Sequence, residues 1–170
     1  MPALLSRPCP HAAATEALGR ALAEALRARG VPALLLTLRG DLGAGKTTLA
    51  RAVLRGLGVT GRIKSPSYAL VERYRVADRL QFNENLEKQV YHIDLYRFSS
   101  EDDWDDAGLR DVLDGRSLCL VEWPERAPAL LRRADLDIEL VPSGEGRIVQ
   151  LRSGSAEGTA LLDWLATHPA

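Results

Sequence analysis

The chain has 170 residues, of which 46% are hydrophobic and 26% are charged, and its formal net charge is −1. This length fits one domain that buries roughly two-thirds of the surface of the unfolded chain. The near-zero net charge gives no global attraction to nucleic acid or acidic lipid, and no apolar run approaches the roughly 20 residues that span a bilayer.

The first half of the chain predicts a helix, a buried strand, a glycine-rich loop and a second helix. Apolar residues recur at helical spacing over 13–29, and Gly30 and Pro32 end this helix. The run ALLLTL at 33–38 is typical of a strand buried on both faces in a parallel sheet. A glycine-rich segment follows directly, and 46–58 continues as a helix that ends at its glycines.

The second half predicts further strands and short helical segments. The polar segment 77–88 is expected to be a hairpin loop or an insertion between two strands. The expected elements are strands at 67–76 and 89–98, helical turns at 101–114, a strand at 117–123, a hairpin of 136–142 and 147–153, and a helix at 156–166. No repeat or linker divides the chain, so we expect one α/β domain over residues 1–170.

The segment GDLGAGKT at 40–47 matches the phosphate-binding pattern G-x-x-x-x-G-K-[ST] at every position. Its glycines let several backbone N–H groups point at one anion, and the following helix adds its positive end. Lys46 is expected to contact the β- and γ-phosphates of a nucleotide, and the Thr47 hydroxyl to bind Mg²⁺. The predicted nucleotide-binding residues here are Asp41, Leu42, Gly43, Ala44, Gly45, Lys46, Thr47 and Thr48.

Two acidic residues stand where apolar strands end and are candidates for a second magnesium ligand. Asp94 ends VYHID, and Glu122 ends LCLVE. A carboxylate in such a place can hold the metal, directly or through water, or can orient or deprotonate the attacking water. With Lys46, these two acids are the predicted catalytic residues. The residues alone leave open which acid serves the metal.

Several classes of P-loop protein are excluded by missing motifs. The chain has no Asn/Thr-Lys-x-Asp motif of GTP-binding switch proteins and no glycine-rich signature helix of transporter ATPases. A small-molecule kinase stays open, with lid arginines sought among Arg126, Arg132 and Arg133. A nucleotide-dependent binding module in which hydrolysis is incidental also stays open.

The motifs GDLGAGKTT, KSPSYALVERY, VYHIDLYR, GLRD and LCLVEWPE occur in the order seen in the bacterial TsaE family. Over about residues 15–147 the chain resembles that family, the ATPase component of the machinery that makes threonylcarbamoyladenosine in tRNA beside the anticodon. The resemblance implies a P-loop NTPase domain with a mostly parallel central sheet, antiparallel hairpin additions and flanking helices. It also implies ATP and Mg²⁺ as cofactors.

The resemblance further implies partners and an output. The partners would be the other subunits of the threonylcarbamoyl transferase complex, of TsaD and TsaB type, with tRNA contacted indirectly at most. ATP turnover would reset the partner transferase, slowly in the isolated protein and faster in the complex.

The resemblance also suggests roles for individual residues. Ser67, in the SPSY segment 65–68, matches a switch-like loop near the γ-phosphate, with serine where threonine is usual. His11, Thr15 and Arg147 are expected near the adenine. Trp123 either packs in the core, which we favour, or lines the nucleotide or partner surface. The segment 77–88 is longer and more polar than expected for the family.

The cysteines and the N-terminal segment favour a reducing compartment. Cys9 and Cys119 lack the CxxC spacing of a metal site, and Cys119 lies in an apolar run that predicts burial. The N-terminal segment does not have the charged start and apolar core of a secretory signal. We therefore expect a cytoplasmic protein without a membrane segment.

Overall fold

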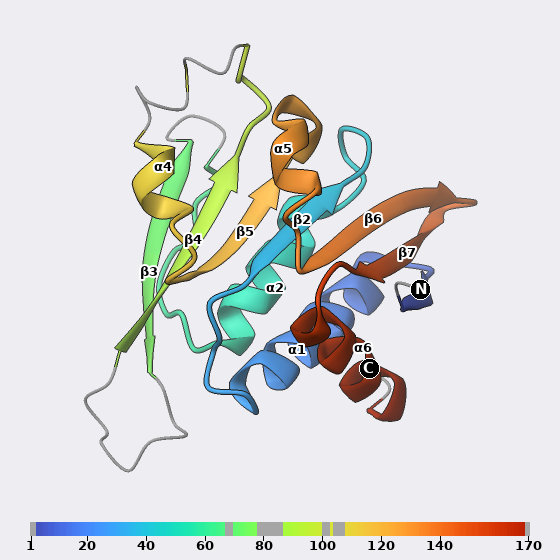
Figure 1. The fold of residues 1–170 in the computed structure, drawn as a ribbon. Coiled ribbons are helices and arrows are strands. Elements are labelled where there is room, and N and C mark those ends of the chain that lie inside the picture. The colour runs from blue at the N-terminus through green and yellow to red at the C-terminus, as the bar shows by residue number, and fades with distance from the viewer. Residues whose placement is uncertain (1–2, 67–69, 78–86, 100–102, 104–107, 169–170) are drawn as a thin grey trace.

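The computed structural model describes residues 3–66, 70–77, 87–99, 103 and 108–168 (Figure 1). The first residues of the strand expected at 67–76, most of the segment 77–88 and about half of the helical turns expected at 101–114 lie outside the described residues. Ser67 lies outside them as well.

The described elements follow the order expected from the sequence. The strands are β1 (Leu4–Cys9), β2 (Leu35–Arg39), β3 (Val71–Ala77), β4 (Glu87–Asp94), β5 (Leu118–Glu122), β6 (Leu136–Ser143) and β7 (Gly146–Ser153). The helices are α1 (Ala12–Arg27), α2 (Lys46–Gly56), α4 (Leu109–Val112), α5 (Pro128–Leu131) and α6 (Ala156–Thr167), with a 3-10 turn, η1 (Pro124–Arg126).

Within the described residues the strands form one seven-stranded sheet in the order β1-β7-β6-β2-β5-β4-β3. The four strands β6, β2, β5 and β4 are parallel to one another, whereas β1, β7 and β3 are antiparallel to their neighbours. This arrangement confirms the predicted α/β class, with a parallel centre and antiparallel additions at both sides.

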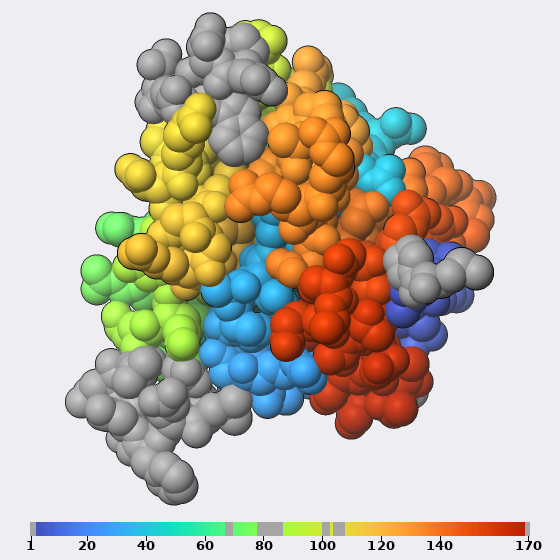
Figure 2. All heavy atoms as spheres, in the orientation of Figure 1, coloured from blue at the N-terminus to red at the C-terminus, as the bar shows by residue number. Residues whose placement is uncertain are grey.

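The interior strand β5 is buried on both faces, because its side chains alternate between two parts of the core. Leu118 and Leu120 join the cluster that α1 and α2 cover, while Cys119 and Val121 join a cluster with residues of α4 and α5. Helix α6 packs against β7 and α1. Segments around α4, α5 and α6 form much of the surface seen in Figure 2.

Glycines bring α1 and α2 into close contact. A Cβ on Gly19 of α1 would lie 2.5 Å from the Cβ of Ala52, and one on Gly56 of α2 would lie 2.5 Å from the Cβ of Ala23. Small residues on both helices thus set the position of α2, the helix that begins at Lys46.

The structure differs from the sequence-based expectation in three places. The 3-10 turn η1 and the helix α5 were not predicted. Strand β1 was not predicted; it lies at the edge of the sheet and pairs only with β7, so the missing N–H of Pro8 is tolerated. Strand β4 ends at Asp94, earlier than the strand predicted at 89–98, because Leu95–Phe98 forms a turn closed by the Phe98 N–H and the Leu95 carbonyl.

The predicted hairpin and closing helix are confirmed as β6, β7 and α6, with Leu161, Leu162 and Leu165 buried. Both cysteines are buried and unpaired with each other. Among the described helices, none has the length and apolar character needed to cross a membrane.

Candidate functional site

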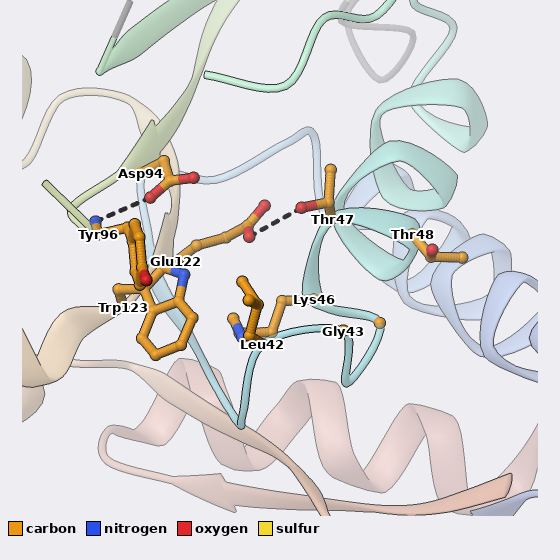
Figure 3. Close-up of a pocket in the computed structure, with 10 residues that line it drawn as sticks. Leu42, Gly43, Lys46, Thr47, Thr48, Asp94, Tyr96, Glu122 and Trp123 are labelled. Carbon is orange, nitrogen blue, oxygen red and sulfur yellow. Dashed lines mark hydrogen bonds between the residues drawn. The ribbon is translucent and has the colours of Figure 1, made fainter. Parts of the chain in front are cut away.

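The candidate site lies where the parallel strands β2, β4 and β5 end, since the carboxyl ends of parallel strands meet at one edge of the sheet. The glycine-rich loop follows β2, and Asp94 and Glu122 occupy paired positions at the ends of β4 and β5. An open pocket of about 230 Å³ lies between them. It is lined by Leu42, Gly43, Gly45, Lys46, Thr47, Thr48, Asp94, Tyr96, Glu122 and Trp123 (Figure 3).

Two glycines shape the loop in a way that other residues would not permit. Gly45 has a φ of 106°, and a Cβ there would lie 2.6 Å from Nη1 of Arg147. Gly40 has a φ of 140°, and a Cβ there would lie 2.6 Å from the carbonyl oxygen of Leu140. The N-cap of α2 is Gly45, which has no side chain to bond the first amides of the helix, so these amides could bind an anion held in the loop.

Lys46 is folded back onto the loop and is only 4% exposed. Its Nζ donates hydrogen bonds to the carbonyl oxygens of Gly40, at 2.5 Å, and Asp41, at 2.8 Å. The ring centroid of Trp123 lies 3.9 Å from the same nitrogen. Burial lowers the pKa of Lys46, and nearby carboxylates, Glu122 first among them, oppose that shift.

The two predicted acids are held by different donors. The Thr47 hydroxyl donates to Oε2 of Glu122 at 2.9 Å, and the backbone N–H of Tyr96 donates to Oδ1 of Asp94 at 2.8 Å (Figure 3). The other oxygen of Glu122, Oε1, lies 2.8 Å from Nε2 of His92. The Glu122 carboxylate is therefore hydrogen-bonded to residues of both α2 and β4.

Aromatic side chains line the pocket beside Lys46. The rings of Tyr96 and Trp123 are 4.9 Å apart at an interplanar angle of 53°, and Tyr96 is 43% exposed. Trp123 packs against the core cluster near α5 and also lines the pocket, so the core interpretation that we favoured is incomplete. Its backbone φ of 59° is unusual for a bulky residue and aims the ring at Lys46.

The residues expected near the adenine lie on the other side of the loop. Nη1 of Arg147 donates to the hydroxyl of Thr15 at 3.1 Å, beside Gly45, although the two residues are 132 positions apart in the chain. His11 is exposed and caps the first turn of α1, where its Nδ1 accepts the N–H of Ala14 at 3.2 Å. The structure therefore brings Thr15 and Arg147 together and leaves His11 at the start of the same helix.

A family model described as "Threonylcarbamoyl adenosine biosynthesis protein TsaE" matches residues 9–149. The chain belongs to the TsaE family. A Haemophilus influenzae protein named tRNA threonylcarbamoyladenosine biosynthesis protein TsaE is 40% identical over 119 residues, which cover 70% of each chain. The Streptomyces coelicolor protein of that name is 42% identical over 109 residues, covering 64% of this chain and 66% of that protein.

A solved structure supports the same relationship. The crystal structure of YdiB from Bacillus subtilis matches with a TM-score of 0.75 and 27% sequence identity, covering 100% of this chain and 99% of that chain. The recognition of the TsaE family from sequence motifs is thereby confirmed.

The oxygen donors of this TsaE-family pocket are of the kind that would suit a magnesium ion. Among the described residues, no group of three or more His, Cys, Asp or Glu side chains could hold a metal ion unaided. The pocket instead offers the Thr47 hydroxyl and the carboxylates of Asp94 and Glu122. Mg²⁺ commonly takes one or two protein oxygens and completes its shell with phosphate oxygens and water, so this donor set fits it.

The arginines that a small-molecule kinase would use as a lid do not line this pocket in the part of the chain that the structure describes. Arg126, Arg132 and Arg133 are absent from its described lining. The guanidinium carbon of Arg126 lies 5.9 Å from the ring centroid of Tyr96.

Sequence reasoning missed two residues of this TsaE-family site, His92 and Tyr96. His92 stands two positions before Asp94, and residues two apart in a strand lie on the same face. That spacing places His92 on the same face of the strand as Asp94, whereas its contact with Glu122 depends on how β4 pairs with β5. Tyr96 follows the end of β4, where no periodic pattern indicates the direction of the side chain.

Proposed function

We propose that this protein binds Mg·ATP in the pocket between β2, β4 and β5 and hydrolyses it as a subunit of the machinery that forms threonylcarbamoyladenosine in tRNA. One observation carries the proposal. In a chain of the TsaE family, Lys46, Thr47, Asp94 and Glu122 line a single pocket at the end of a parallel sheet.

The loop residues would bind the phosphate chain. The ammonium of Lys46 would exchange the carbonyls of Gly40 and Asp41 for phosphate oxygens, to which charge-assisted hydrogen bonds are stronger. The first amides of α2 would point at the same oxygens. Thr15 and Arg147, with His11 nearby, would lie toward the adenine.

The hydroxyl and the acids would organise the reacting end. A bound magnesium ion supplies positive charge that stabilises the phosphates during transfer. Thr47 and one of the two acids, Asp94 or Glu122, would hold that ion. The other acid would orient the attacking water or accept its proton.

The output would be conformational. Hydrolysis would release the segment 65–68, including Ser67, as loss of a γ-phosphate releases the switch loops of other nucleotide-binding proteins. Turnover would thereby reset a partner transferase of TsaD and TsaB type in the cytoplasm. The isolated protein would hydrolyse ATP slowly, because part of the catalytic arrangement would come from that complex.

The experiment is nucleoside analysis of tRNA from cells depleted of this protein and rescued with the parent or with Lys46→Ala. We expect threonylcarbamoyladenosine to disappear on depletion and to return only with the parent. Unchanged modification in depleted cells would refute the proposed pathway. Rescue by Lys46→Ala would refute the need for the loop.

Three experiments, on the purified protein and in cells, distinguish the alternatives. A small-molecule kinase would yield a phosphorylated acceptor in place of free phosphate. A binding module with incidental hydrolysis would keep its cellular function in Glu122→Gln while turnover stops. Equal hydrolysis rates with and without the partner subunits would contradict stimulation by the complex.

A further inference from the structure

A fully buried histidine lies behind Glu122 and has no part in the mechanism above. His92 is 0% exposed, and its Nε2 lies 2.8 Å from Oε1 of Glu122, which is itself 2% exposed. The hydroxyl of Thr47 donates to the other oxygen of the same carboxylate. Glu122 is thus held between β4 and α2, one oxygen to each.

The hydrogen bonding of His92 is one-sided. Its Nδ1 is buried and has no hydrogen-bond partner among the described residues. A carboxylate oxygen can only accept a hydrogen bond, so we assign the ring proton of His92 to Nε2, which donates a hydrogen bond to Glu122. A buried polar atom without a hydrogen-bond partner destabilises the folded state. An apolar side chain would avoid that cost, so packing alone does not explain a histidine here.

The neighbouring acid is fixed in another way. Asp94 has a short side chain, and its Oδ1 accepts a backbone N–H, that of Tyr96. Glu122 has a longer side chain with one more rotatable bond and reaches toward α2 across the pocket (Figure 3). Its orientation therefore depends on side-chain donors.

We propose that His92 is a positioning residue, whose Nε2–H fixes the carboxylate of Glu122 so that Oε2 faces Thr47 and the pocket. This inference rests on the proposed function of the pocket as an Mg·ATP site. A preorganised carboxylate need not reorient when the nucleotide binds or when water attacks. The residue acts through Glu122 and touches neither nucleotide nor water.

Three substitutions of His92 separate positioning from packing. His92→Gln keeps an amide N–H near the position of Nε2, whereas the shorter side chain of His92→Asn does not reach Glu122. His92→Leu fills the space and donates nothing. Val90→Ala, on the same face of β4 and also 0% exposed, is the control for loss of core packing.

We expect His92→Asn and His92→Leu to lower the kcat of ATP hydrolysis by about 10- to 100-fold, the usual effect of removing an outer-shell partner of a metal site. In the same two variants, Mg²⁺ should strengthen the binding of a non-hydrolysable ATP analogue less than it does in the parent. Calorimetry with and without Mg²⁺ measures this difference. ADP binding without Mg²⁺ should stay at the parent value. His92→Gln should retain most of the kcat, and Val90→Ala should lower the melting temperature without either effect.

A double-mutant cycle completes the test. In a Glu122→Gln background, His92→Leu should lower turnover no further, because the carboxylate that it positions is gone. The inference is wrong if His92→Asn matches the parent, if His92→Gln loses as much as His92→Asn, or if the two losses are additive. Failure of the proposed function looks different, since the parent protein itself would then neither bind nor hydrolyse ATP.

Discussion

Two substitutions of Glu122 should separate the stability of this protein from its turnover. In Glu122→Gln the amide oxygen can still accept the N–H of His92, and the amide NH₂ can donate to the Thr47 hydroxyl, which rotates to accept it. Both hydrogen bonds survive. The free energy of unfolding should therefore change by less than about 1 kcal/mol.

Glu122→Ala removes both hydrogen bonds and leaves a cavity. The buried N–H of His92 loses its acceptor, which costs about 1–3 kcal/mol, and truncation of a fully buried side chain adds a further loss. We expect a total of about 3–5 kcal/mol from these two losses together. At about 2–4 °C per kcal/mol for a chain of this size, the melting temperature should fall by roughly 6–20 °C.

The assays are urea denaturation for stability and phosphate release for turnover. Both variants should lose at least about 100-fold in turnover, since each lacks the carboxylate charge and proton acceptor. A Glu122→Gln variant as unstable as Glu122→Ala would refute the hydrogen-bonding scheme around Glu122. A Glu122→Gln variant that hydrolyses ATP at the parent rate would refute the role of this acid.

Three further predictions concern the loop, the helix contact and the thiols. Gly45→Ala would place a Cβ 2.6 Å from Nη1 of Arg147 at a φ of 106°, so calorimetry should show nucleotide affinity at least about tenfold weaker; parent-like affinity would contradict the loop geometry. Gly19→Ala would place a Cβ 2.5 Å from the Cβ of Ala52 and should lower the free energy of unfolding by about 1–3 kcal/mol. An unchanged midpoint of urea denaturation would contradict this prediction. Burial raises the pKa of Cys119 to about 12 and also raises the pKa of Cys9. At pH 8 the folded protein should therefore react with a thiol reagent far more slowly than the unfolded chain, and its reaction rate should increase with pH. Equal rates for the folded and unfolded chains would contradict this.

Local patterns in the sequence were sufficient to predict that the glycine-rich loop and both acids lie at one pocket. The glycine-rich loop has fixed spacing between a buried strand and a helix, and Asp94 and Glu122 each end an apolar run. Strands of this kind are parallel and end at one edge of the sheet, so the convergence of these residues follows from the fold class. The choice between the two acids does not follow, because both occupy equivalent strand positions.

Contacts that depend on strand register were beyond local reasoning. The bond between His92 and Glu122 requires Asp94 to pair with Glu122, which no pattern within either strand specifies. Strand β1 was missed because Pro8 disfavours a strand and because its partner, β7, lies at the other end of the chain. Thr15 and Arg147 were placed near each other only through the family resemblance.

The pairing of β1 with β7 also constrains when the proposed nucleotide site could be completed during synthesis. Leu4 pairs with Arg152, and the contact of Arg147 with Thr15 depends on the same hairpin. When the glycine-rich loop and both acids of a nascent chain have emerged from the ribosome, Arg147 has not yet done so. A nucleotide bound as proposed would therefore stabilise this protein fully only near the end of translation, after the glycine-rich loop has been made.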